Sequence, residues 1–392
     1  MEKVVIFLAS AIIRAHGLRL TTTTTWETLS ARTGGAPRAS PTVLTLYRDT
    51  NGWCPFCERV WIALEKKGIA YDEVLINLYD KPKYYTDMIP TGLVPAIEIH
   101  DGSYNSGSPG SGELVYESSE ILKRLDVLVP NVDLRANEEV PEVVERALST
   151  AYAVAYGGSR NATAYVEAMD ALDAILDPFV RGEKLSAADL VMVPMMERYR
   201  YQLDLFSPGN KKLLDGKPGL RRWFAALEAD PAYRRVAGDE YSWTATAAAF
   251  LRIFGNATDD DPRAIDARER SAAILEAAEA DAEALEDSAA CLEAATKLVA
   301  NHRAVVDDAC NVDPPKSQTR LTRLGAADRD AVDATLRVAA AALLDGAVGD
   351  AAQAADPRAA RLVASRLCAP RDMSAPAARS LRHVLMRLAA AA

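Results

Sequence analysis

The chain has 392 residues, of which 49% are hydrophobic and 26% charged, a composition that fits a globular protein of two or three domains and excludes a disordered chain. Its formal net charge is −10 and no basic stripe is visible, so nucleic acid is not expected as a partner. Only two of its five cysteines are closely spaced, which is not the pattern of a secreted disulfide framework.

Residues 1–40 have the order of a targeting segment. An apolar stretch over 4–13, too short to span a bilayer, precedes a Ser/Thr-rich and acid-poor stretch over 18–40. We predict a cleaved peptide that directs the protein to a plastid or another organelle, and no stable membrane span. Glu2 and the poorly defined cleavage site leave a disordered tail on a cytoplasmic protein as the alternative.

A Cys-x-x-Cys pair lies where a predicted strand over 42–47 leads into a predicted amphipathic helix that ends at Gly68. A cysteine at a helix N-terminus faces unpaired N–H groups and the positive end of the helix dipole, which favour thiolate over thiol. We therefore predict that Cys54 is the acidic, exposed sulfur. Pro55 suits the first helical turn, and Cys57 follows one turn further in as a candidate resolving thiol.

A structural zinc site and two inert buried cysteines are the alternatives for this pair. Zinc needs two more ligands, but Cys291, Cys310 and Cys368 are far away in sequence and the four histidines are not clustered. We predict no metal.

The following residues predict a small α/β domain. A second strand over 70–76 is expected parallel to the first, because a helix separates them. A strand over 93–99 enters through an X-Pro bond, and residues 113–120 run from strand into helix. Between them, the Gly/Ser-rich residues 100–112 are expected to form a flexible surface loop.

Four motifs in this order resemble the glutathione transferases, and among them the cysteine-using omega, lambda and dehydroascorbate-reductase types. The resemblance covers roughly residues 42–255. It implies a thioredoxin-like α/β N-terminal domain over 41–127 and an all-α glutathione-transferase C-terminal domain over 134–255. The motifs are Cys54-Pro55-Phe56-Cys57-Glu58-Arg59, Asn77-Leu78 to Lys81-Pro82, Gly92-Leu93-Val94-Pro95 and Glu117-Ser118.

The resemblance also implies a glutathione site. Cys54 matches the cysteine that forms a mixed disulfide with glutathione. Pro95 matches a cis-proline, which would leave the N–H and C=O of Val94 free to pair with the cysteinyl part of glutathione. Cys57 departs from the family, which usually has alanine or serine there, so the choice between monothiol and dithiol chemistry stays open.

The two ends of glutathione have candidate partners as well. Glu117 and Ser118 match the pair that holds the γ-glutamyl end, with a carboxylate for its ammonium and a hydroxyl with helix-terminal amides for its carboxylate. Lys81 matches a lysine that reaches the glycyl carboxylate. The alternatives are an exposed acid, an ordinary helix cap and an ordinary loop lysine, with Lys83 two residues further on.

After a linker over 126–133 the pattern becomes helical. Apolar spacing near 3.6 predicts helices over 141–156, 162–175, 187–205 and 220–227. Ser186 and Asp189 form the S-x-x-D pattern of a capping box.

Residues 256–392 form an Ala-rich extension that contains no Phe, Tyr or Trp and has no role that the sequence reveals. Its core has to be built from Leu, Val, Ile and Ala, and we expect an extra layer of helices. The predicted helices cover 264–305, 326–344, 357–367 and 376–388.

These patterns favour a glutathione-dependent thiol transferase, which reduces mixed disulfides or small oxidised substrates such as dehydroascorbate through the Cys54 thiolate. The alternatives are a glutathione-conjugating transferase and a non-enzymatic glutathione-binding or interaction protein of the same fold. Glutathione is the expected co-substrate, and the sequence leaves monomer and homodimer open. Thiol chemistry needs a reducing pool, which suits a plastid or the cytosol.

Overall fold

The computed structural model describes residues 24–34, 42–100, 112–156, 162–207, 216–280, 285, 288–311, 323–348 and 350–391. The chain divides into two compact units. We call the first the sheet-containing unit, which comprises Arg38–Ile274 and Leu367–Ala378. The all-helical unit comprises Met1–Pro37, Leu275–Arg366 and Arg379–Ala392.

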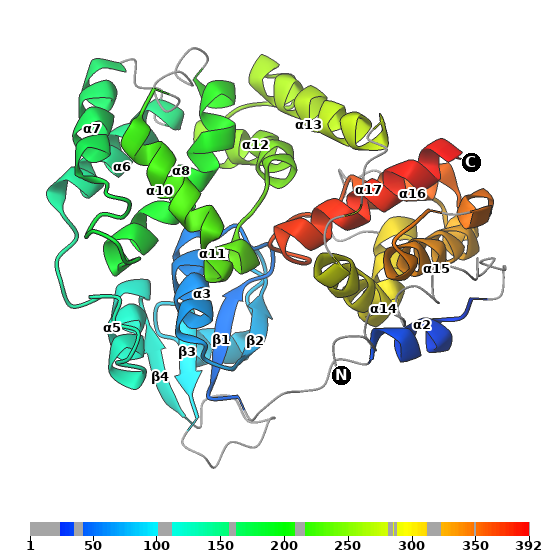
Figure 1. Cartoon of the computed structure of the whole chain (residues 1–392), viewed down its shortest axis with the longest axis horizontal. Coiled ribbons are helices and arrows are strands. Elements are labelled where there is room, and N and C mark those ends of the chain that lie inside the picture. Colours follow the sequence, from blue (N-terminus) through cyan, green and yellow to red (C-terminus); the bar gives the residue numbers. More distant parts are fainter. Residues whose placement is uncertain are drawn as a thin grey trace, which may run out of the picture. The chain divides into compact units, whose positions relative to one another are not determined.

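The sheet-containing unit is built on a four-stranded sheet with the strand order β2-β1-β3-β4 (Figure 1). β1 pairs parallel with β2 and antiparallel with β3, and β3 pairs antiparallel with β4. This is the predicted β-α-β followed by β-β-α, so the expected thioredoxin-like α/β domain is confirmed. The strands are β1 (Leu44–Asp49), β2 (Tyr71–Ile76), β3 (Ala96–Ile99) and β4 (Glu113–Tyr116).

The two faces of the sheet have separate cores because side chains alternate along each strand. Leu44 and Leu46 of β1 are buried in the main core together with apolar side chains of the long helix after the strand. Tyr47 is buried on the other face in a smaller cluster with Tyr85. The three helices of this domain are α3 (Pro55–Lys67), α4 (Lys83–Met88) and α5 (Ser118–Leu128).

Two strand boundaries differ from the predicted ones. β1 continues past Tyr47 to Asp49, because Asp49 is paired in register with Ile76 of β2. Backbone pairing, which the propensity of a single aspartate does not reveal, decides this end. The strand predicted from 93 begins only at Ala96, after a proline that has no N–H to donate. The loop predicted over 100–112 lies outside the described residues, apart from its two ends.

The rest of the sheet-containing unit is helical, as predicted, and α13 continues past its end at Ile274. Trp223 and Trp243 are the largest fully buried side chains of this region. Its helices are α6 (Glu142–Ala155), α7 (Ala162–Ile175), α8 (Ala187–Phe206), α10 (Pro218–Ala229), α11 (Pro231–Val236), α12 (Glu240–Gly255) and α13 (Pro262–Ala280).

α8 begins with the predicted capping box. The Asp189 carboxylate accepts hydrogen bonds from the N–H of Ser186 at 2.9 Å and from its hydroxyl at 2.6 Å. The other carboxylate oxygen accepts from the indole N–H of Trp223 at 3.0 Å. The buried box thus fixes both the start of α8 and its packing on α10.

The all-helical unit has a small core of aliphatic side chains and alanines, as its composition predicted, and Ala339 to Ala342 are fully buried. The helix predicted over 264–305 is two helices, because α13 ends at Ala280 and α14 begins at Ser288. The helices of this unit are α2 (Trp26–Thr33), α14 (Ser288–Cys310), α15 (Arg329–Asp345), α16 (Pro357–Ala364) and most of α17 (Ala375–Ala391), with short 3-10 turns at Ala326–Asp328 and Asp350–Ala354.

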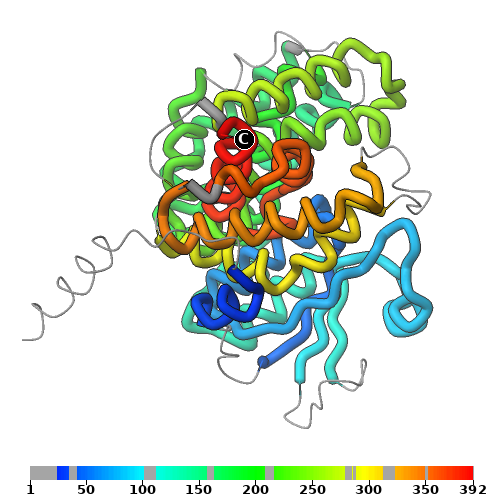
Figure 2. Tube along the Cα trace, turned by 90° about the vertical axis from the view of Figure 1, so that its right-hand side faces the viewer, coloured from blue at the N-terminus to red at the C-terminus, as the bar shows by residue number. Residues whose placement is uncertain are grey.

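α2 lies within the segment predicted as a cleaved peptide, and yet it is packed in the all-helical unit. It contacts α14 and α15, as Figures 1 and 2 both show. The Trp26 ring stacks on His302 with centroids 4.1 Å apart, and its indole N–H donates to Asp333 at 2.8 Å. Leu29 is fully buried. Residues 24–34 are therefore part of a folded unit.

No helix in the described part of the chain is long and apolar enough to cross a membrane.

Candidate active site

Cys54 is the N-cap residue of α3, and Pro55 occupies the first helical position. The Cys54 carbonyl accepts the first helical hydrogen bond, from the N–H of Glu58 at 3.1 Å. The side chain is partly exposed and its Sγ lies 3.8 Å from the carbonyl oxygen of Val94. The sulfur therefore stands at the helix terminus predicted from the Cys-x-x-Cys spacing.

The two thiols of the motif differ in acidity. The pKa of Cys54 is lowered, first by a hydrogen bond from the Cys57 thiol and further by the backbone N–H groups of Cys57 and Phe56, against burial and the charge of Asp49. The pKa of Cys57 is raised well above its usual range, first by burial and then by Cys54. Cys54 is thus the more acidic and more nucleophilic thiol of the pair, and the buried Cys57 is the less acidic one.

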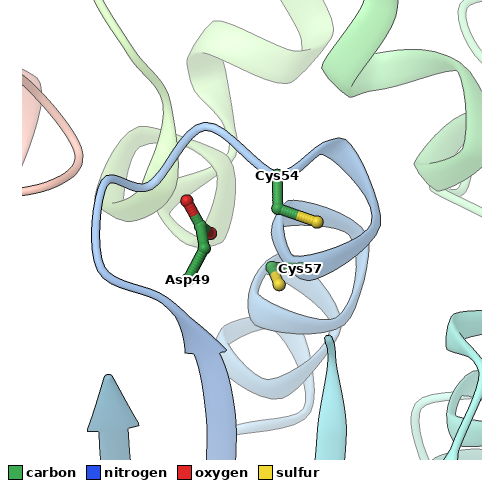
Figure 3. A group of neighbouring side chains, drawn as sticks. All are labelled: Asp49, Cys54 and Cys57. Carbon is green, nitrogen blue, oxygen red and sulfur yellow. The ribbon is translucent and has the colours of Figure 1, made fainter. Parts of the chain in front are cut away.

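Asp49 completes a cluster with these thiols that the sequence did not predict. A carboxylate oxygen of Asp49 and the two sulfurs all lie within 4.8 Å of one another (Figure 3). Asp49 Oδ2 accepts the N–H of Trp53 at 2.7 Å, whereas Oδ1 is buried and has no hydrogen-bond partner in the described structure. Its position at the carboxyl end of the first strand, beside the start of α3, is the signal that could have indicated it.

The same three side chains offer two thiolates and a carboxylate as possible metal ligands. Structural zinc sites usually have four protein ligands. Among the residues that the structure describes, no fourth cysteine, histidine or acidic side chain joins this group within the same distance. The absence of a metal stays a prediction.

The bond between Val94 and Pro95 is cis, as the resemblance implied. Pro95 is buried directly before β3, and the Val94 carbonyl faces the Cys54 thiol. The hydroxyl of Tyr85 donates to the preceding carbonyl, that of Leu93, at 2.6 Å. The segment before β3 is thus held beside the N-terminus of α3.

Glu117 and Ser118 lie at the same edge of the sheet, one strand further along. The register of β3 and β4 pairs Ala96 with Tyr116, so Glu117 follows next to Pro95. Glu117 is exposed and has a φ of 68°, which is unusual for a residue other than glycine and costs about 1–3 kcal/mol. Ser118 is buried at the first turn of α5. Strain of this kind often accompanies a side chain held for binding.

Lys81 lies in the loop before α4 and is half-buried. Lys83, the competing lysine, is exposed and pairs with Asp87 at 2.7 Å. No hydrogen bond joins Lys81 to the other predicted site residues within the described ranges. The role of Lys81 at the glycyl carboxylate therefore stays a prediction.

Arg59 is a further charged residue of the motif that we did not predict as functional. Its guanidinium lies 4.8 Å above the Phe56 ring and donates to the Val191 carbonyl at 3.3 Å. Burial lowers the pKa of Arg59 to about 10, against the charges of Cys54 and Glu58. Arg59 remains a cation at neutral pH and supports negative charge on Cys54.

Residues of the C-terminal extension also reach the loop before Cys54. Gly52 is buried with a φ of 68°, and a Cβ at this position would lie 3.3 Å from the Arg371 backbone N and 3.4 Å from Pro370 Cγ. The Ala369 N–H donates to the hydroxyl of Ser242, at the start of α12, at 2.8 Å. Leu367–Ala378, predicted as part of the Ala-rich extension, thus packs within the sheet-containing unit.

Residues 53–128 match the family model described as the N-terminal domain of glutathione S-transferase. The chain contains a glutathione S-transferase N-terminal domain. The predicted resemblance to the cysteine-using members is confirmed by the relatives that the chain matches.

Two of these relatives show the degree of similarity. Glutathione S-transferase DHAR2 of Arabidopsis thaliana is 29% identical over 188 residues, which are 46% of this chain and 81% of that protein. Glutathione S-transferase omega-1 of Sus scrofa is 27% identical over 197 residues, which are 46% of this chain and 75% of that protein. About half of the chain therefore has its counterpart in these transferases.

Two solved structures are also similar to part of this chain. The dehydroascorbate reductase of Chlamydomonas reinhardtii is 22% identical with a TM-score of 0.42, and the match covers 50% of this chain and 92% of that one. The glutathione transferase Omega 1C of Trametes versicolor is 21% identical with a TM-score of 0.44, covering 55% of this chain and 97% of that one.

Proposed function

We propose that the protein is a glutathione-dependent thiol transferase that reduces mixed disulfides or small oxidised substrates of the dehydroascorbate type. The observation that carries this proposal is Cys54, a partly exposed cysteine with a lowered pKa at the N-terminus of α3. The names of the relatives, which include glutathione transferases of the DHAR and omega types, support the same class of reaction.

The proposed reaction begins when the Cys54 thiolate attacks the glutathionyl sulfur of a mixed disulfide. A bond forms between Cys54 Sγ and that sulfur, the old disulfide bond breaks, and the substrate leaves as a thiolate that takes a proton from water. A second glutathione then attacks the glutathione sulfur of the Cys54–glutathione disulfide, which frees the Cys54 thiolate and forms glutathione disulfide. Alternatively, Cys57 attacks Cys54 Sγ, which forms a Cys54–Cys57 disulfide and releases glutathione. No metal takes part in these steps.

We propose that glutathione lies along the edge of the sheet that carries Cys54, Val94 and Glu117. The backbone of Val94 would pair with the cysteinyl residue, which brings the glutathione sulfur to the Cys54 side of α3. Glu117 and the first turn of α5 at Ser118 would hold the γ-glutamyl end. Lys81 would hold the glycyl carboxylate.

The test is glutathione-coupled reduction of a mixed disulfide and of dehydroascorbate, in wild type and in the Cys54→Ser and Cys57→Ser variants. We expect Cys54→Ser to lose turnover completely. A wild type that binds glutathione but turns over neither substrate contradicts the proposal. That result would favour one of the two alternatives. A glutathione-conjugating transferase would add glutathione to an electrophile, which an electrophilic substrate tests, whereas a non-enzymatic protein would bind glutathione without converting any substrate.

For localisation we propose an organelle, reached through a cleaved N-terminal segment. Because α2 is packed against α14 and α15, we expect the cleavage to precede Thr24. N-terminal sequencing of the mature protein from its source tests this. A mature N-terminus within or after α2, or an uncleaved protein in the cytoplasm, would contradict it.

A further inference from the structure

We propose that Asp49 is the proton acceptor for Cys57, and that the enzyme resolves its glutathione adduct through an internal Cys54–Cys57 disulfide. This inference rests on the proposed thiol transferase function and selects the dithiol route within it. Three observations support it: the position of the carboxylate, the partner that it lacks, and the burial of Cys57.

The first observation is distance. One carboxylate oxygen of Asp49 and the sulfurs of both cysteines lie within 4.8 Å of one another. Figure 3 shows the three side chains grouped at the start of α3, with Asp49 on the adjoining end of β1. A gap of this size needs a small shift or a single bridging water for proton transfer.

The second observation is an unsatisfied acceptor. Oδ2 of Asp49 accepts the Trp53 N–H at 2.7 Å, but Oδ1 is buried with no hydrogen-bond partner among the described residues. A buried acceptor that is left unpaired destabilises the folded protein, and more so when the group is charged. A structural role for Asp49 needs only Oδ2, so the unpaired oxygen calls for another explanation, and proton acceptance provides one.

The third observation is that Cys57 cannot act as a nucleophile without help. It is buried, and burial together with the nearby charges holds the pKa of its thiol well above the usual range. At neutral pH very little of it is thiolate, so its attack on a disulfide requires a base at the moment of reaction. Within the described residues the neighbouring carboxylate of Asp49 is placed for this role.

The charged and titratable groups around Asp49 come from α3, from β1 and from the segments that pack against them. On α3, Oε2 of Glu58 is paired with Arg198 at 2.7 Å, while its Oε1 is buried without a hydrogen-bond partner among the described residues. On β1, Arg48 donates to the backbone carbonyl of Asp49 at 3.0 Å and pairs with Glu73 at 2.9 Å. Together these groups are Cys54, Cys57, Glu58, Arg198, Arg48, Glu73, and Arg371 next to Gly52 with its partner Asp372.

In the proposed step, Cys57 displaces glutathione from Cys54. The Cys57 thiol gives its proton to the Asp49 carboxylate, and the electron pair on its sulfur attacks Cys54 Sγ of the Cys54–glutathione disulfide. A Cys54–Cys57 disulfide forms, the bond to glutathione breaks, and glutathione leaves as a thiolate that takes the proton back from Asp49. In this step the Cys57 sulfur is oxidised and the glutathione sulfur is reduced, while Cys54 keeps the oxidation state that it had in the mixed disulfide. Two further glutathione molecules then restore the dithiol and leave as glutathione disulfide.

The test separates formation of the adduct from its resolution. Reduced full-length protein is mixed with glutathione disulfide, quenched with acid at intervals and analysed by intact mass. Wild type should pass through the adduct to the internal disulfide, and Cys57→Ser should stop at the adduct. Asp49→Asn should form the adduct as fast as wild type or slightly faster, because the charge of Asp49 raises the pKa of Cys54. Its resolution should then be about 100-fold slower near neutral pH.

The pH profile distinguishes a proton acceptor from a structural role. In Asp49→Asn the resolution rate should rise about tenfold per pH unit, because hydroxide replaces the missing base, whereas the wild-type rate should depend less on pH. The asparagine oxygen can still accept the Trp53 N–H, so the loop is expected to keep its conformation. Asp72→Asn, a carboxylate of β2 that binds Thr42 at 2.7 Å, serves as the control and should resolve like wild type.

Three outcomes are informative. Resolution of Asp49→Asn at the wild-type rate would overturn the role of Asp49. A wild type that stays at the glutathione adduct would overturn the dithiol route but leave the thiol transferase function intact. Failure of wild-type Cys54 to form any adduct would overturn the proposed function itself, and this inference with it.

Discussion

Arg198 of α8 forms a buried ion pair with Glu58 of α3, the residue that directly follows Cys57, with 2.7 Å between Nη1 and Oε2. The same guanidinium donates to the Trp53 carbonyl at 2.9 Å and lies 4.1 Å above the Trp243 ring. The helical region thereby fixes both the loop before Cys54 and the first turn of α3.

Because both charges are buried, removing one leaves the other without a partner. Arg198→Met is expected to lower the free energy of unfolding by about 3–5 kcal/mol. Urea unfolding measures this, and the double variant Arg198→Met/Glu58→Gln, which removes both charges, should recover part of the loss. A loss of less than about 1 kcal/mol in the single variant would contradict a buried, hydrogen-bonded pair.

The lowered pKa of Cys54 predicts thiolate reactivity at neutral pH. Below its pKa the sulfur is protonated and its alkylation by iodoacetamide slows about tenfold per pH unit, so the midpoint of the rate profile should lie below about 8.5, the usual value for cysteine. Peptide mapping by mass spectrometry assigns the rate to Cys54.

The hydrogen bond from Cys57 is the largest cause of this shift, which gives a matched pair of variants. Cys57→Ala removes the donor and should move the Cys54 midpoint upward, whereas Cys57→Ser keeps a donor and should change it less. Equal midpoints in the two variants would show that backbone amides alone control the acidity of Cys54.

The folding stability of the protein is expected to depend on pH through the buried carboxyl group of Glu197. It is buried, and burial raises the pKa of its carboxyl group to about 8, with Glu58 adding to the shift. Between about pH 5 and pH 8 the native state therefore holds a proton that the unfolded chain has released. The stability from this group is complete below the unfolded pKa of about 4.3 and is lost as the pH rises towards 8.

Glu197→Gln removes this titration. Relative to wild type, the variant should gain up to about 1.4 kcal/mol of stability per pH unit across that window. The glutamine oxygen can still accept from the Gly238 N–H and the Trp243 indole, which donate to Glu197 at 2.8 Å and 2.6 Å. Urea unfolding across the range is the measurement, and parallel pH profiles for the two proteins would refute the raised pKa.

The close packing of the Leu367–Ala378 segment on Gly52 indicates that this segment stabilises the loop before Cys54. Gly52→Ala suffers both a positive φ and the approach of its new Cβ to the Arg371 backbone, so we expect a loss of about 2–4 kcal/mol. Gly68→Ala is the matched control, because Gly68 has a φ of 63° but no atom within 4 Å of an added Cβ. It should cost only about 1–2 kcal/mol.

The difference between these two variants, measured by thermal unfolding, reports the packing of the segment on the loop. Gly52→Ala should also slow the reaction of Cys54, two residues away, whereas Gly68→Ala should not. Equal losses in both variants would show that the segment does not hold the loop.

Because α2 packs against α14 and α15, we expect residues before β1 to stabilise the folded protein. Leu29 is fully buried in the all-helical unit, so Leu29→Ala is expected to lower the free energy of unfolding by about 2–5 kcal/mol. Ser30 is exposed on the same helix, and Ser30→Ala should have little effect. Urea unfolding of both variants is the measurement, and a neutral Leu29→Ala would show that α2 is not a stable part of the unit.

The sequence by itself determined the features that depend on near neighbours. The strand-to-helix junction at Cys54, the capping box of Ser186 and Asp189 and most helices follow from spacing within one turn or one strand, because these interactions join residues a few positions apart. The resemblance to glutathione transferases, which rests on short motifs, predicted the cis bond at Pro95. It also predicted Glu117 and Ser118 as site residues, and these follow β4 at the edge of the sheet that carries Pro95.

Only the tertiary structure decided which distant groups surround the thiols. Asp49 reaches them because β1 extends by pairing with β2, and Arg198 reaches Glu58 across 140 positions of sequence. Pro370 and Arg371, which are far from Gly52 in the sequence, pack against it. Local propensities contain no information on such contacts, because packing of whole elements against one another brings these residues together.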